Sequence, residues 1–283
     1  MPGVQDLGVA LDDTELTPND AAARLQSLFE AAKAKDEFEF ACALLRVRGM
    51  ESAGWDPFIE TSYLVEDLMG LIGAPLRGHT KVRLGLLLYS HLTEVKAIYS
   101  VLANLSRVIN GERYALDPFL DATPKNKKGE PLFLSTPATV EALRGMLDEA
   151  GHAPVAELFD WFFVSGIRNA FSHADYTLHQ DKFRSSSERF LVGGILTPEI
   201  NLDLLADIFN RALAFYGCFV GEYETQRMSY TASKVVPGRI AGDEPVPVEL
   251  VADVDRGLHG FRSPPGEAQD PGAAPSPEDG QAP

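Results

Sequence analysis

A helical pattern that ends in polar residues, over residues 153–173, constrains this chain more than any other segment. Apolar residues recur in it at three- and four-residue steps, which is the spacing of one face of an α-helix. An Arg-Asn pair, Arg168 and Asn169, and then His173 close the segment. At about 100° per residue, Arg168 points away from the apolar face, on the same side as Trp161. Because a tryptophan is rarely left in open water, we expect a second helix or a second copy of the chain to cover this side.

The spacing of these polar residues resembles a known motif. Arg168-x4-His173, with Asn169 after the arginine, is similar to the Arg-x(4 to 6)-His motif of the HEPN superfamily, whose all-helical domains include many metal-independent ribonucleases. The resemblance covers about residues 80–230, in the order long helix, loop, motif helix, hairpin and last helix. It implies an all-α, HEPN-like helical bundle with a small β-hairpin insertion. It also implies a homodimer with a composite site near the two-fold axis, and a toxin or defence role under an antitoxin or regulatory protein.

RNA cleavage without a metal gives these residue types a chemical reason. The reaction needs one group that takes the proton from the 2′-hydroxyl, another that protonates the leaving 5′-oxygen, and positive donors around the phosphate. Histidine, with an ordinary pKa of about 6.5, transfers protons at neutral pH, which indicates this role for His173. Arg168 presents a charged planar fork to phosphate oxygens, and Asn169 orients it.

The two ends of the motif do not meet on one helix. Arg168 and His173 lie about 140° apart around a straight helix, so two copies of the chain are expected to complete the site. The sequence therefore predicts a homodimeric, metal-independent endoribonuclease with RNA as its substrate and no cofactor.

Other polar residues are candidates for accessory roles. Glu94, with His91 three residues before it, is predicted to lie on a long helix, where it would pair with Arg168 or act in proton transfer. The remaining candidates for accessory roles are Ser172 and Asp175.

The net charge of −16 argues against a large nucleic-acid footprint. Any RNA contact must therefore be local, and the predicted RNA-binding residues near the motif are Lys182, Arg184 and Arg189. The loop ATPKNKKGEP adds Lys125, Lys127 and Lys128, for which solvation is the simpler interpretation.

Two other interpretations of the motif stay open. Arginine and histidine at the C-terminus of a helix can satisfy the last carbonyls and the negative end of the helix dipole. A HEPN-like fold can also be a non-catalytic binding or scaffold protein, because the fold does not determine the function.

Composition divides the chain into three parts. Residues 1–16 are predicted to be a flexible N-terminus and residues 17–236 the HEPN-like domain. Residues 237–283 hold nine prolines and nine acidic residues against three arginines, which predicts a disordered acidic tail. The start of the chain lacks a basic and apolar leader pattern, and the two cysteines lie singly in apolar helical contexts, so we expect a cytoplasmic protein without a membrane segment or a metal site.

Start and stop signals predict the helices. Thr17-Pro18 begins a helix that breaks near Asp36, another follows over residues 57–71, and a long one over residues 80–110. Further helices are predicted after Thr136-Pro137, after Ala153-Pro154 and after Asn201. Residues 175–184 and 189–196 read as the two strands of the hairpin.

Overall fold

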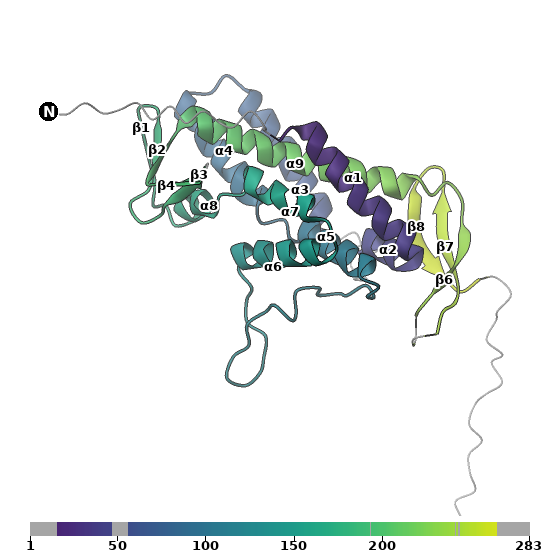
Figure 1. The fold of residues 1–283 in the computed structure, drawn as a ribbon. Helices are drawn as coiled ribbons and strands as arrows, with labels where there is room; N and C mark the ends of the chain where they lie inside the picture. The colour runs from purple at the N-terminus through teal and green to yellow at the C-terminus, as the bar shows by residue number, and fades with distance from the viewer. Residues whose placement is uncertain (1–15, 47–55, 193, 241, 243, 265–283) are drawn as a thin grey trace, which may run out of the picture.

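The structure is a computed structural model that describes residues 16–46, 56–192, 194–240, 242 and 244–264 (Figure 1). Almost all of the predicted flexible N-terminus lies outside these residues. The helices are α1 (Pro18–Lys35), α2 (Glu37–Leu45), α3 (Pro57–Gly73), α4 (Gly78–Leu92), α5 (Lys96–Ile109), α6 (Thr136–Glu149), α7 (Ala153–Phe162), α8 (Ser165–Ser172) and α9 (Leu202–Met228).

Capping side chains set three of the predicted helix boundaries. Thr17 and Asp20 form a reciprocal capping box: the Thr17 hydroxyl accepts from the Asp20 N–H at 3.2 Å, and the Asp20 carboxylate accepts from the Thr17 N–H at 2.9 Å. Asp36 ends α1 and caps α2, and Asn201 caps α9 by accepting from the Leu204 N–H at 2.7 Å. The predicted starts at Thr17-Pro18 and Asn201 and the break near Asp36 are confirmed.

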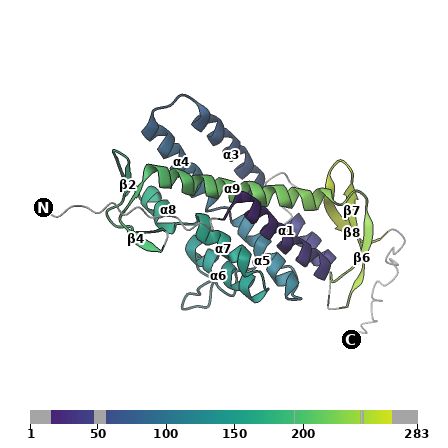
Figure 2. The same ribbon diagram turned by 45° about the horizontal axis from the view of Figure 1, so that its top comes forward.

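The helical body is built around α9. Helices α1, α4 and α7 pack along α9, and α5 lies between α1 and α6 (Figures 1 and 2). Phe159 of α7 joins these layers, because its ring lies 6.0 Å from that of Tyr99 in α5 and 5.6 Å from that of Phe215 in α9. By length and composition alone α9 is a candidate membrane span; 33% of its apolar window is buried inside the domain, where Phe215 and Phe219 pack on α7 and α1.

Two helices that the sequence predicts as continuous are broken. Residues 80–110 form α4 and α5, separated at residues 93–95, and the motif helix of residues 153–173 forms α7 and α8, separated at residues 163–164. At the first break the Thr93 hydroxyl bonds back to the Tyr89 carbonyl at 3.1 Å, while the Tyr99 hydroxyl donates to the Thr93 carbonyl at 2.8 Å. The apolar pattern runs through both breaks, so periodicity alone did not reveal them.

The prediction of an all-α fold is wrong, because the helical body carries three small antiparallel sheets. The strands are β1 (Thr177–His179), β2 (Lys182–Arg184), β3 (Phe190–Val192), β4 (Ile195–Thr197), β5 (Glu199–Asn201), β6 (Lys234–Gly238), β7 (Val246–Asp253) and β8 (Gly257–Arg262). They pair in the orders β1-β2-β5, β3-β4 and β6-β7-β8. Each of the two strands predicted for the hairpin is itself a short hairpin, because Gln180 and Gly194 adopt the positive φ that a tight turn needs.

The prediction that the chain is disordered from residue 237 is also wrong as far as residue 264. Strands β6, β7 and β8 cover α2 and the end of α9 (Figure 1). Phe261 packs edge-on against Phe38 at 5.3 Å, and Arg239 donates to the Asp36 carboxylate at 3.0 Å. The sheet has its own buried residues, which are Val236, Val248, Leu250, Ala252 and Leu258. Residues 265–283 of the predicted tail lie outside the described residues.

This sheet is expected to contribute to the stability of the whole domain. Leu258 is fully buried, so Leu258→Ala should lower the free energy of unfolding by about 2–5 kcal/mol, measured by chemical denaturation. Val254, in the turn of the same sheet, is 67% exposed, and Val254→Ala should change the free energy of unfolding by no more than about 0.5 kcal/mol. Equal, small effects of both substitutions would mean that the sheet folds apart from the helices.

Candidate functional site

The motif lies on α8, and a buried tyrosine fixes where this helix starts. The Tyr89 hydroxyl donates to the Phe162 carbonyl at 3.0 Å and accepts from the Val164 N–H at 2.7 Å. It thereby satisfies the backbone groups that the break between α7 and α8 leaves without helical partners. Burial raises the pKa of Tyr89, so the hydroxyl keeps its proton at neutral pH.

The break also changes the environment of Trp161. This side chain is only 8% exposed within a single chain, and Trp161 lies in the last turn of α7 rather than on the same helix as Arg168. Of the two expected covers for Trp161, another part of the same chain or a second copy, the structure has the first, so Trp161 does not support a dimer.

Removal of the Tyr89 hydroxyl is expected to destabilise the fold. Tyr89→Phe leaves the buried Phe162 carbonyl and the partly buried Val164 N–H without this partner, which should lower the free energy of unfolding in urea by about 1–3 kcal/mol. Tyr63→Phe is the matched control, because Tyr63 is 58% exposed and its hydroxyl loss should have an effect below about 0.5 kcal/mol. If Tyr89→Phe were as stable as the wild type, the hydroxyl would not hold the break.

Arg168 has two partners that hold its guanidinium. Its Nη2 forms an ion pair with Glu94 Oε1, and its Nη1 donates to Asn169 Oδ1 at 3.1 Å. Glu94 reaches Arg168 because it lies in the turn between α4 and α5, where its N–H donates to the His91 carbonyl at 3.0 Å. The two side chains are 29% and 30% exposed, so the pair adds little stability, on the order of 1 kcal/mol at most, and a ligand can still reach the guanidinium.

His173 lies at the end of α8 as its C-cap. Its N–H donates to the Asn169 carbonyl at 3.0 Å, and Ala174, with φ of 53°, lets the Asp175 N–H return to the Ala170 carbonyl at 2.9 Å. The backbone thus satisfies the end of the helix by itself. Within the described residues the exposed His173 imidazole has neither a hydrogen bond nor an ion pair, so its side chain does not serve to end the helix.

His91 faces a cleft rather than Arg168. The cleft has a volume of about 1020 Å³, and His91, Glu94 and Lys96 line it together with the ion pair of Arg46 and Asp56. The His91 Nε2 atom is buried and has no partner among the described residues. Burial lowers the pKa of His91, so its imidazole is neutral at pH 7. Glu94 belongs to both places, because it lines the cleft and pairs with Arg168.

Asp175 ties the end of the motif to the loop before β3. Its carboxylate accepts hydrogen bonds from the Ser185 hydroxyl at 2.7 Å, from the Ser187 N–H at 3.0 Å, and from the hydroxyls of Ser186 and Ser187. These bonds hold the pKa of Asp175 far below its usual value. A carboxylate so strongly acidic is a poor proton carrier, so the structure favours a positioning role for it. Ser172, the last residue of α8, is exposed.

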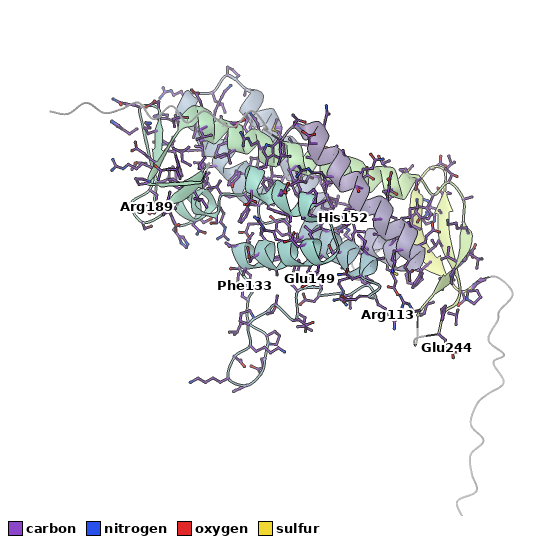
Figure 3. All side chains as sticks on the ribbon, viewed as in Figure 1. Arg113, Phe133, Glu149, His152, Arg189 and Glu244 are labelled. Carbon is purple, nitrogen blue, oxygen red and sulfur yellow. The ribbon has the colours of Figure 1, made fainter. Side chains whose placement is uncertain are left out.

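Only one of the three predicted RNA-binding cations lies against α8. Arg189 is exposed, and its backbone carbonyl lies so close to Gly166 that a Cβ there would be 2.7 Å from the oxygen. Only glycine permits this approach between α8 and β3. Lys182 and Arg184 belong to the separate sheet β1-β2-β5, where Arg184 Nε lies 4.0 Å from Glu199 Oε2. Figure 3 shows Arg189 beside α8.

Comparison with protein-family models, with curated proteins and with solved structures found no match. The HEPN resemblance stays a hypothesis that rests on the motif. Within the part of the chain that the structure describes, no group of three or more His, Cys, Asp or Glu residues is arranged to hold a metal ion.

Sequence reasoning missed two residues that place the motif, Tyr89 and Gly166. Neither carries a local signal, because an apolar helix pattern accepts tyrosine anywhere and one glycine inside a helix has many explanations.

Proposed function

We propose that this chain is a HEPN-like, metal-independent endoribonuclease, acting as a toxin or defence effector under an antitoxin or regulatory protein. The observation that carries the proposal is the state of the motif side chains. Arg168 is held by Glu94 and Asn169 yet partly exposed, and His173 is exposed with its imidazole free of partners in the described residues. Neither side chain is used to finish the helix.

Each residue has a defined part in the proposed reaction. Arg168 binds the phosphate and stabilises the charge that develops on it, while Asn169 fixes the guanidinium. The His173 side chains of the two copies supply the two proton transfers, one from the attacking 2′-hydroxyl and one to the leaving 5′-oxygen. The bond between phosphorus and the 5′-oxygen breaks as the 2′-oxygen bond forms, so the products carry a 2′,3′-cyclic phosphate and a free 5′-hydroxyl.

A second copy of the chain supports this chemistry, and the hairpin β3-β4 offers a surface for it. Leu191 and Leu196 lie directly opposite each other on one face of the hairpin and are 60% and 65% exposed, while Ile195, which is 47% exposed, points to the other face. Strand β3 packs on α8 through Phe190, so Leu191 points away from this helix and the exposed leucines form an apolar face on the outer side of the hairpin. We place the two-fold contact there, because one α8 leaves Arg168 and His173 about 140° apart.

The ion pair of Arg168 with Glu94 also favours a second candidate, a non-catalytic binding or scaffold protein. A guanidinium that already has a carboxylate partner attracts phosphate less strongly than a free one. An assay of RNA cleavage by the purified protein in EDTA, comparing the wild type with variants of Arg168 and His173, decides between the two candidates.

A further inference from the structure

The loop between α5 and α6 contains an ordered hairpin at residues 124–133 (Figure 1). Asn126 organises its turn: Asn126 Oδ1 accepts from the N–H groups of Lys128 at 2.8 Å and Glu130 at 3.0 Å, and its Nδ2 donates to the Glu130 carboxylate at 2.7 Å. Below the turn, residues 125 and 131 form a β-bridge, and the Leu132 N–H donates to the Pro124 carbonyl at 2.7 Å. These bonds define the backbone of the turn that carries the three lysines.

This hairpin gathers positive charge on an acidic protein. Lys125, Lys127 and Lys128 are all exposed, and Glu130 is the only acidic residue within residues 124–133, with its carboxylate engaged by Asn126. The whole chain has a net charge of −16, and three exposed lysines at one turn concentrate positive charge locally. Lysines at this density favour a polyanionic partner.

Phe133, the last residue of the hairpin, carries an exposed aromatic ring. Phe133 is 70% exposed, and the Lys96 ammonium lies 4.6 Å from the centre of its ring (Figure 3). Lys96 covers one face, and a ring this exposed leaves surface on which a base can stack.

Phe133 is connected to the motif through Lys96 and Glu94. Lys96 begins α5 only two residues after Glu94, a backbone span of at most about 7 Å, and Glu94 is paired with Arg168. The path from the lysine turn therefore runs through Phe133, Lys96 and Glu94 to Arg168.

We propose that residues 124–133, together with Lys96, form a docking site for single-stranded RNA that leads the strand toward Arg168. The choice of RNA rests on the proposed function. The three lysines contact phosphates, and one unstacked base lies on Phe133, which is the combination that single-stranded nucleic acids require. An anionic membrane or an acidic peptide matches the lysines as well, but neither accounts for the connection from Phe133 to a phosphate-binding arginine.

The test measures binding separately from cleavage. Full-length protein carrying His173→Ala is titrated against a fluorescein-labelled 15-nucleotide RNA of mixed sequence, with fluorescence anisotropy as the readout at several salt concentrations. Adding Lys125→Gln, Lys127→Gln and Lys128→Gln should weaken binding at least about tenfold and reduce the slope of log affinity against log salt by about 2, at about 0.7 for each lost contact. Phe133→Ala should weaken binding by about fivefold or more without changing this slope.

The matched control removes the same charge elsewhere. Arg77, Lys81 and Arg83 are exposed at the start of α4, on the protruding α3–α4 pair (Figure 2), and their triple change to glutamine should leave the affinity within about twofold. Unchanged melting temperatures verify the fold of each variant.

Different results separate the two proposals. The docking site is overturned if the loop variants bind RNA as the parent does, if the control triple weakens binding equally, if no variant binds RNA at all, or if the lysines affect only binding to phosphatidylserine vesicles. Binding that depends on the loop, in a wild type that cleaves no RNA, would preserve the docking site and reject the ribonuclease.

Discussion

Replacing His173 with alanine should lower the rate of RNA cleavage by at least about 100-fold, the usual effect of losing one general acid or base. Arg168→Ala should have a loss of similar size, because it removes charge stabilisation at the phosphate. Both effects are measured with a labelled RNA under single-turnover conditions. Cleavage by the wild type should persist in EDTA and yield 2′,3′-cyclic phosphate ends, since the proposed reaction uses only side chains and the neighbouring hydroxyl.

Two controls distinguish chemistry from folding. His179 is also exposed, on β1, and His179→Ala should retain activity within about twofold. The melting temperatures of the Arg168 and His173 variants should stay within a few degrees of that of the wild type, because both side chains are partly or fully exposed. A purified dimer that cleaves neither structured nor single-stranded RNA would reject the enzyme and leave the binding or scaffold protein.

Leu191→Asp should convert the protein from a dimer to a monomer and abolish cleavage together with dimerisation. A buried, unpaired carboxylate in the apolar contact between two β3-β4 hairpins is strongly unfavourable, and Leu191 faces Leu196 directly across the hairpin. Sedimentation at micromolar concentration gives the oligomeric state, and the RNA assay gives the activity. The expected loss is at least about 100-fold, because one chain does not bring both motif residues to one phosphate.

Leu71→Asp is the control for this experiment. Leu71 is 52% exposed on α3, so the variant should remain a dimer and stay active. A wild type that sediments as a monomer, or a Leu191→Asp variant that cleaves RNA normally, would contradict the composite site.

The helix ends were predictable because their causes are local. A Thr-Pro start and an Asn cap act within three or four residues, and the structure has them at Thr17 and Asn201. The breaks were not predictable, because their causes are distant in sequence. The hydroxyl that holds the break before α8 comes from Tyr89, which lies 75 residues before Val164.

The sheet β6-β7-β8 was not predicted for a different reason. Averaged over residues 237–283, prolines and acidic residues outweigh the apolar ones, and the average predicts disorder. Shorter windows contain a strand signal: the apolar runs of β7 and β8 flank a turn in which Asp253 accepts from two backbone N–H groups and Gly257 adopts a φ of 62°. The composition of the long segment therefore concealed the strands within it.

The candidate site could likewise be predicted only where the causes are local in sequence. Arg168, Asn169 and His173 lie on one short helix, so their neighbourhood follows from spacing alone. The pairing of Glu94 with Arg168 was weighed from the sequence as one option, but it depends on a turn that periodicity did not reveal. The bonds of Asp175 to three consecutive serines depend on the course of the loop after β2, which the sequence pattern does not specify.

The turn at residues 93–95 has a consequence for how this protein can change. The turn holds Glu94 against Arg168. Helix α5 starts directly after the turn with Lys96, whose ammonium lies against the ring of Phe133. An insertion or deletion in this turn would change where α5 starts relative to α4 and displace both contacts together. The length of the turn, more than the identity of its residues, therefore sets the spacing between Arg168 and the ring of Phe133. An insertion or deletion in the turn cannot move one of these two side chains and leave the other in place.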